Sequence, residues 1–278
     1  MHGKTIVMTG ATSGIGAVAA EQLAEQGARI VFVARDEKRA GATLATLRRI
    51  SDASHAAHLA DLSSIADTKR VGAEIAAANP RIDVLVNNAG AMFTDRRTTV
   101  DGLERTFALN HMAYFVLTEA LRERLGASAP ARIVSTASGA HMGAKLDFDD
   151  LQLAESFSGW KAYSRSKLCN ILFTRELARR LEGTGVTANC LHPGFVASRF
   201  GDEAGGLVGR FAGLAKLFAI SPERGADTIV WLASSPEVEG KTGGYWYRRR
   251  LTSPSREARD ENAARLLWTR SAEIAGVE

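Results

Sequence analysis

Short apolar runs alternate with helical patterns along most of the chain. The runs are rich in β-branched residues and occupy positions 4–9, 29–34, 82–86, 132–135 and 186–191. The first helical pattern is Ala-rich, extends from Ala17 to Gln26 and is closed by Gly27. Strands that alternate with helices in this way predict an α/β fold: a doubly wound parallel sheet with helices on both faces.

Nothing in the sequence divides this alternation. No long linker, repeat or low-complexity segment interrupts it, and 45% of the 278 residues are apolar, enough for one buried core. We therefore expect a single domain over residues 1–278. Glycines interleaved with apolar residues at about 195–220 predict either a mobile substrate lid or a surface helix that packs its own apolar face.

Charge and cysteine content exclude several classes of function. The net charge of +4 is small and dispersed, and the cluster Arg248-Arg249-Arg250 is too small for a nucleic-acid surface, so we expect it to pair with carboxylates, for instance on another subunit. Cys169 and Cys190 lack metal-ligand spacing and are expected to be buried hydrophobes in a reducing compartment. No metal is predicted.

The N-terminus and the hydropathy suggest a location. The first strand begins at Lys4, which leaves no room for a secretory signal, and no apolar stretch is long enough to span a bilayer. We expect a soluble cytoplasmic protein with no membrane span.

A glycine turn joins the first strand to the first helix. Its sequence is Thr9-Gly10-Ala11-Thr12-Ser13-Gly14-Ile15-Gly16. Glycines let backbone N–H groups approach a pyrophosphate, and the helix N-terminus adds partial positive charge. The alternative is an ordinary glycine-rich turn, but the strand-turn-helix-strand context favours a dinucleotide. The expected contacts are Gly10, Thr12, Ser13, Gly14, Ile15 and Gly16.

Tyr163 and Lys167 carry the candidate chemistry. They are four residues apart, so both side chains project from one face of a helix. A nearby ammonium favours the phenolate and can lower a phenol pKa from near 10 toward neutrality. The same spacing arises by chance on solvated helices, and it gains weight here from the glycine turn upstream.

Together these motifs resemble the short-chain dehydrogenase/reductase family. The matching residues occur in family order: Thr9-Gly10-x-x-x-Gly14-x-Gly16, Asn87-Asn88-Ala89-Gly90, Asn110, Ser138, Tyr163-x-x-x-Lys167 and Pro193-Gly194. Residues 110–115, 166–173 and 243–245 are similar to the retinol-dehydrogenase-like subgroup. The resemblance implies an NAD(P)-dependent oxidoreductase that interconverts a carbonyl compound and its alcohol, and a homodimer or homotetramer with contacts through the predicted helices at 99–124 and 160–181.

The resemblance also implies four catalytic residues. Tyr163 is the acid in reduction and the base in oxidation, and Lys167 lowers its pKa and binds the nicotinamide ribose. Ser138 holds the substrate oxygen, and Asn110 anchors a water that links the lysine to solvent. Ser138 follows Ala137, where the family frequently has a first serine. Taken singly, such a serine can be a turn residue and such an asparagine a helix kink.

The residue after the second strand bears on cofactor choice. Arg35 stands where an acidic residue would bind a ribose hydroxyl, and an arginine there favours the 2′-phosphate of NADP(H). Asp36 is expected to point elsewhere, and Lys38 and Arg39 add positive charge. If Arg35 is only a solvated residue, NAD(H) is also possible. The resemblance adds further cofactor contacts: Asp61 and Leu62 at the adenine; Asn87, Ala89 and Gly90 near the adenosine ribose; Tyr163, Lys167, Pro193, Gly194, Val196 and Ser198 at the nicotinamide side.

The substrate side is predicted to be apolar. Residues expected to line it are Met92, Phe93, His141, Met142, Phe195 and Phe200. This favours a lipophilic ketone, aldehyde or secondary alcohol. Two alternatives stay open: an NADP(H)-dependent carbon–carbon double-bond reductase, which can use the same Tyr-Lys pair, and a non-catalytic NADP(H)-binding regulator on the same fold.

Overall fold

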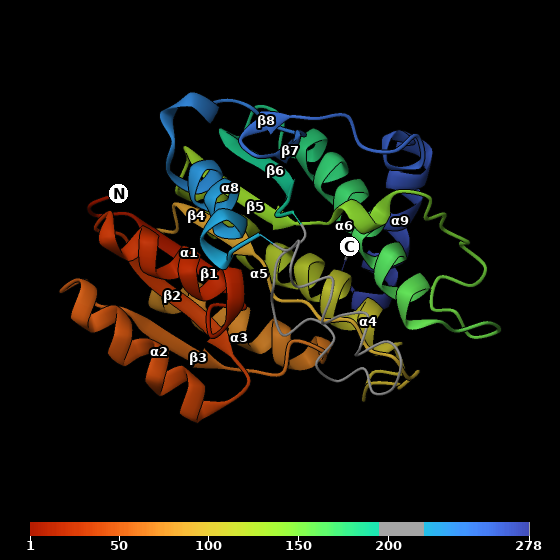
Figure 1. Ribbon diagram of the computed structural model, residues 1–278, viewed down its shortest axis with the longest axis horizontal. Helices are drawn as coiled ribbons and strands as arrows, with labels where there is room; N and C mark the ends of the chain where they lie inside the picture. Colours follow the sequence, from red (N-terminus) through yellow and green to blue (C-terminus); the bar gives the residue numbers. More distant parts are fainter. Residues whose placement is uncertain (195–219, 278) are drawn as a thin grey trace.

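The described strands form one sheet whose order reverses at β1. The computed structural model describes residues 1–194 and 220–277. Its strands are β1 Thr5–Thr9, β2 Arg29–Ala34, β3 Ala56–Leu59, β4 Val84–Asn87, β5 Ala131–Thr136, β6 Val186–His192, β7 Tyr245–Tyr247 and β8 Arg250–Leu251. The sheet order is β3-β2-β1-β4-β5-β6-β7-β8, parallel except for β8 (Figure 1). The predicted doubly wound parallel sheet is confirmed, and its order reverses between β1 and β4.

Helices cover both faces of this sheet. They are α1 Gly14–Glu25, α2 Glu37–Ile50, α3 Ile65–Ala78, α4 Arg105–Phe107, the π-helix η1 Ala108–Met112, α5 Ala113–Ala127, α6 Gly159–Arg180, α8 Pro222–Ser234 and α9 Glu261–Ala275, with 3₁₀ turns η2 Gly139–His141, η4 Pro236–Val238 and η5 Glu257–Arg259. Alternate residues of β1 enter different cores: Ile6 and Met8 pack with α1 and α8, whereas Val7 belongs to the core that contains α5, α6 and α9. Figure 1 shows α1 beside α8 on one face.

The C-terminal helix α9 covers part of the two long helices α5 and α6. The Trp268 ring stacks on Phe173 of α6 with centroids 5.8 Å apart, and meets Phe115 of α5 edge-on at 5.0 Å. His111 bonds through Nε2 to Ser271 Oγ at 2.8 Å. These faces of α5 and α6 are therefore covered within one chain, so a subunit contact through these helices would need their other side chains.

Three local features complete or correct the sequence prediction. Helix α1 begins at Gly14 rather than at Ala17. The β7–β8 hairpin was not predicted, and its turn places Arg248 and Arg249 at φ 49° and 60°. Arg249 pairs with Asp227 of the same chain, so the arginine cluster does contact a carboxylate.

The two cysteines agree with expectation. Cys169 and Cys190 are buried free thiols. Within residues 1–194 and 220–277, no helix combines the length and the apolarity that a membrane crossing needs.

Candidate active site

The glycine turn and the start of α1 are packed against the end of β4. Gly10 has φ +71°, and a Cβ added there would lie 2.9 Å from the backbone of Ala89. A Cβ on Gly16 would lie 2.0 Å from the Gly10 oxygen and 2.4 Å from Asn88 Nδ2. The two glycines are therefore needed for the close approach of turn, helix and strand.

Asn88 ties three strand ends together at this edge of the sheet. Its backbone N–H donates to Thr9 Oγ1 at 2.9 Å, and its Nδ2 donates to the Gly10 oxygen at 3.3 Å. Its Oδ1 accepts from Thr136 Oγ1 at 3.1 Å. Asn88 therefore holds the carboxyl ends of β1, β4 and β5 in register.

The neighbours of Asn88 face different surroundings. Asn87 is fully buried and donates from Nδ2 to Thr118 Oγ1 of α5 at 3.0 Å, so its side chain points away from the glycine turn. Ala89 N–H joins Asn88 in donating to Thr9 Oγ1. A Cβ on Gly90 would lie 3.1 Å from Asn110 Oδ1 and 3.4 Å from Lys167 Nζ. Gly90 thus lies between the cofactor-side turn and the candidate catalytic residues.

An arginine and an aspartate follow the end of β2. Arg35 is exposed. Asp36 is the N-cap of α2, and its Oδ1 accepts from the Arg39 N–H at 2.7 Å. At the end of β3, Asp61 Oδ1 accepts from the backbone and hydroxyl of Ser63, and Leu62 is nearly buried.

Helix α6 brings Tyr163 and Lys167 to the same edge as the end of β5. Ser138 follows β5 and forms a side-chain hydrogen bond with Tyr163. Lys167 Nζ donates to the Thr136 oxygen at 3.0 Å and lies 5.7 Å from the Tyr163 ring centroid. It also lies 5.8 Å from the ring of Tyr114, so the ammonium is next to two aromatic rings.

Burial controls the protonation of this pair. It raises the pKa of Tyr163 to about 12, and the hydrogen bond with Ser138 offsets only part of that rise. It also lowers the pKa of Lys167 to about 7. The expected lowering of the Tyr163 pKa toward neutrality is therefore not what the protein alone shows. Desolvation penalises the phenolate, and the same desolvation weakens the positive charge that would stabilise it.

Asn110 lies in the π-helix η1 and connects to Tyr163 through Ser166. Its Oδ1 accepts from the Ala91 N–H, and its Nδ2 donates to the Ala91 oxygen and to Ser166 Oγ, all at 2.9 Å. Ser166 Oγ donates to the Tyr163 carbonyl at 2.7 Å. The wider π turn is a common feature of functional sites. Ser166 was missed by the sequence analysis, and its place within the Tyr-x-x-x-Lys run was the available signal.

The predicted substrate side is only partly described. Pro193 and Gly194 follow β6. The predicted residues Phe195, Val196, Ser198 and Phe200 and nearly all of the predicted lid lie outside the described residues. Met142 is 55% exposed and Trp160 is 62% exposed. The Trp160 ring lies 6.3 Å from that of Tyr163.

Two other predicted lining residues are placed differently. His141 is fully buried, so the expectation that it lines the pocket is wrong. The Arg105 guanidinium lies over the Phe93 ring, 3.5 Å from its centroid.

Comparisons with known proteins agree with this geometry. The family model of the short chain dehydrogenases matches residues 4–205. The chain belongs to the short chain dehydrogenase family. Retinol dehydrogenase 13 of Homo sapiens is 39% identical over 99% of this chain and 86% of that protein. The predicted retinol-dehydrogenase-like subgroup is thereby confirmed, and the protein is an NAD(P)-dependent oxidoreductase that acts on alcohols or carbonyl compounds.

Two further similarities concern a bacterial relative and a solved structure. A protein of Streptomyces sp. (strain C5), provisionally named a daunorubicin C-13 ketoreductase, DnrU, is 40% identical over 99% of this chain and 94% of that protein. A short chain dehydrogenase from Burkholderia cenocepacia J2315, solved in complex with NADP, has a TM-score of 0.71 at 27% identity, with 88% of this chain and 95% of that chain covered.

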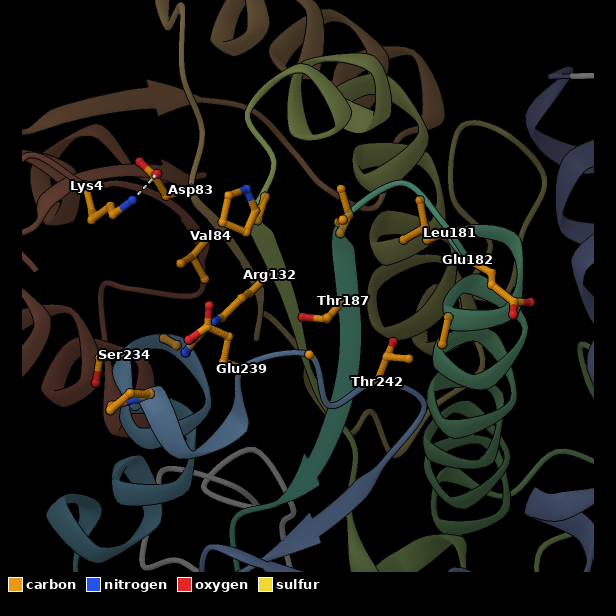
Figure 2. A pocket seen from close by; sticks show the side chains of 18 of the residues that line it. Lys4, Asp83, Val84, Arg132, Leu181, Glu182, Thr187, Ser234, Glu239 and Thr242 are labelled. Atoms are coloured by element: carbon orange, nitrogen blue, oxygen red, sulfur yellow. Dashed lines mark hydrogen bonds and ion pairs between the residues drawn. The ribbon is translucent and has the colours of Figure 1, made fainter.

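A cavity of about 800 Å³ lies at the opposite edge of the sheet in this dehydrogenase. It is lined by the first residues of β4, β5 and β6 and contains none of the predicted site residues. Figure 2 shows the Lys4–Asp83 ion pair on its wall and Arg132 close to Glu239. The described residues also hold no group of three His, Cys, Asp or Glu side chains placed to bind a metal ion.

Proposed function

We propose that this short chain dehydrogenase uses NADP(H) to interconvert a lipophilic ketone or aldehyde and its alcohol, with Tyr163 as the acid and base. The observation that carries the proposal is the meeting of Ser138, Tyr163 and Lys167 at the sheet edge that also holds the glycine turn. Ligands of doubly wound sheets bind at this edge, where the strand order reverses.

The residues present fit a nicotinamide dinucleotide phosphate. Gly10 and Gly16 let the turn, the start of α1 and the end of β4 pack closely, and the N-cap Ser13 forms no side-chain bond with the first N–H groups of α1, which leaves these groups for a pyrophosphate. Arg35 is exposed and available to a 2′-phosphate. Asp36 caps α2 through the bond from the Arg39 N–H, which holds its carboxylate at the start of that helix. When bound, the cofactor supplies or accepts the hydride.

The chain's own residues would control the proton. Ser138 would donate a hydrogen bond to the substrate oxygen and hold it against the Tyr163 hydroxyl. Because burial raises the pKa of Tyr163 to about 12, the phenol is protonated at neutral pH, which is the form that carbonyl reduction requires. Alcohol oxidation requires the phenolate, so we expect its rate at neutral pH to be limited by the small deprotonated fraction of Tyr163.

Two observations support an apolar substrate. Met142, one residue beyond η2, and Trp160, in the first turn of α6, expose large apolar side chains close in sequence to Ser138 and Tyr163. Retinol, which occurs in the name of one relative, is a largely apolar alcohol, and the name of a second relative refers to reduction of a ketone at C-13 of daunorubicin. We propose by analogy that the substrate here is of comparable character.

The test is consumption of NADPH or NADH with all-trans-retinal, decanal and 2-decanone, and with pyruvate as a small charged control. Turnover with NADPH and the apolar carbonyls, at least about tenfold above NADH and pyruvate, supports the proposal. Preference for pyruvate would contradict the substrate class, and NADPH binding without turnover of any carbonyl would favour double-bond reduction or a regulatory role. The expected single domain, the homodimer or homotetramer and the cytoplasmic location stay predictions.

A further inference from the structure

His141 is a buried histidine with a hydrogen bond at each ring nitrogen. Its Nε2 accepts from the backbone N–H of Ser255 at 3.1 Å, and its Nδ1 lies 2.6 Å from the carbonyl oxygen of Ser138. An amide N–H can only donate and a carbonyl oxygen can only accept. The two partners therefore require the neutral tautomer with its proton on Nδ1.

The bond between His141 Nδ1 and the Ser138 carbonyl holds the Ser138 backbone at a point where the chain has left the sheet. The last ladder bond of β5 is from the Ala137 N–H to the Leu191 oxygen at 2.8 Å. Beyond it, the Ser138 carbonyl accepts from both the backbone N–H and the ring of His141. The Ser138 side chain also accepts from the Ala140 N–H at 3.1 Å. The direction of the Ser138 hydroxyl therefore depends on a turn that His141 closes.

The other end of His141 is fixed by the C-terminal segment. Ser255 lies 114 residues later in the chain, and its hydroxyl accepts from the Ala258 N–H at the start of η5. The Tyr245 ring of β7 packs on the imidazole edge-on, with centroids 5.2 Å apart. His141 is thus held by two elements that are distant from Ser138 in sequence and that take no part in the chemistry.

We propose that His141 is a positioning residue: its ring closes the Ser138 turn and so aims the Ser138 hydroxyl at Tyr163 and the substrate oxygen, while the bond from Ser255 sets the tautomer that the ring needs for this. This inference rests on the proposed function, because it assumes that Ser138 orients the carbonyl. A misplacement of about 1 Å in such a group can lower the rate about 100-fold.

Two amide substitutions separate the two bonds. In His141→Asn the amide nitrogen takes the place of Nδ1, so the bond to Ser138 is kept and the bond to Ser255 is lost. In His141→Gln the amide oxygen takes the place of Nε2, so the bond from Ser255 is kept and the bond to Ser138 is lost. We expect His141→Gln to lower kcat for decanal about 10- to 100-fold and His141→Asn to lower it less than about threefold, with the NADPH Kd unchanged in both.

Two controls keep the test decisive. His55 is also buried, accepts from the Ile30 N–H and bonds to Ser51 at the other end of the sheet, so His55→Gln should lower stability and leave kcat unchanged. In a Ser138→Ala background, His141→Gln should cause no further loss of kcat. If Ser138→Ala lowers kcat and His141→Gln does not, or if the two losses multiply, the positioning role is overturned while the proposed function stands.

Two other results have separate meanings. If Ser138→Ala leaves kcat unchanged, the catalytic role of Ser138 in the proposed function fails, and the inference fails with it. The tautomer is checked without any variant by ¹⁵N NMR of the histidine rings in the intact protein. A protonated Nδ1 on His141 supports the geometry, and a protonated Nε2 overturns it even if the variants do not fold.

Discussion

Substitution of Gly16 by alanine tests the packing of the cofactor turn. A Cβ at this position would lie 2.0 Å from the Gly10 oxygen, whereas ordinary contacts begin at 3.4 Å, so turn and helix must separate by at least about 1.4 Å (3.4 − 2.0). Overpacking of this kind costs about 1–3 kcal/mol. Loss of the bond from Asn88 to Gly10 costs about 1 kcal/mol, which offsets the helix preference for alanine of about the same size.

We expect Gly16→Ala to lower the free energy of unfolding by about 1–3 kcal/mol. NADPH binding should weaken at least about tenfold, because displaced backbone N–H groups no longer reach the pyrophosphate. Urea unfolding and NADPH fluorescence measure the two effects. Gly41→Ala is the matched control, since Gly41 lies in α2 with nothing within 4 Å of an added Cβ.

The control should gain about 0.5–1 kcal/mol of stability and bind NADPH normally. Gly16 and Gly41 are both helical, so helix preference alone predicts the same sign for both substitutions. If Gly16→Ala gained stability as Gly41→Ala does, with NADPH affinity unchanged, the close approach of Gly16 to Gly10 would be refuted.

Three further changes probe cofactor choice, buried charge and proton transfer. Arg35→Ala should raise the NADPH Kd about tenfold or more and leave the NADH Kd unchanged. Arg48 lies on the last turn of α2, and if Arg48→Ala weakened NADPH binding equally, the effect would be one of nonspecific charge. Asp83 is nearly buried, which raises its pKa, but the bonds from Thr5, Lys4 and Arg81 outweigh burial, so the net pKa is lowered. The ionised carboxylate therefore stabilises the fold above about pH 4, and this stabilisation is lost as the pH falls. Asp83→Asn should cost about 2 kcal/mol at pH 7 in urea unfolding and flatten the loss of stability below pH 4; an unchanged acid profile would contradict this. Because the Tyr163 pKa is about 12, alcohol oxidation should rise about tenfold per pH unit from pH 7 to 10 while carbonyl reduction does not; an oxidation plateau below pH 8 would contradict this.

The elements that the sequence predicted well are those with local signals. Alternating apolar runs and helical patterns located β1, β2, β5, β6 and α6 to within a few residues. The start of α1 was placed late because Gly14 and Gly16 are poor helix formers, although close packing requires them at the first turn. The β7–β8 hairpin was missed because its positive-φ turn residues are Arg248 and Arg249, rather than the usual glycine or asparagine.

The candidate site likewise combines features that have a local sequence signal with features that have none. Motif spacing brought Ser138, Tyr163 and Lys167 to one place, as predicted. Their pKa values could not be read from spacing, because desolvation depends on how completely the surrounding chain covers them. His141 was predicted to line the pocket, but its side chain is fully buried. One of its hydrogen bonds comes from Ser255, 114 residues later in the chain, and no local pattern reports such a contact.

The most direct test of the account is the reduction of decanal by NADPH with the wild-type protein and Tyr163→Phe, with the NADPH Kd measured for both. The substitution removes the proton donor and leaves the ring that packs near Lys167 and Trp160. We predict a loss of kcat of about 100- to 10,000-fold with an unchanged NADPH Kd. A variant that binds NADPH and reduces decanal at the wild-type rate would contradict the role of Tyr163 and, with it, the proposed mechanism.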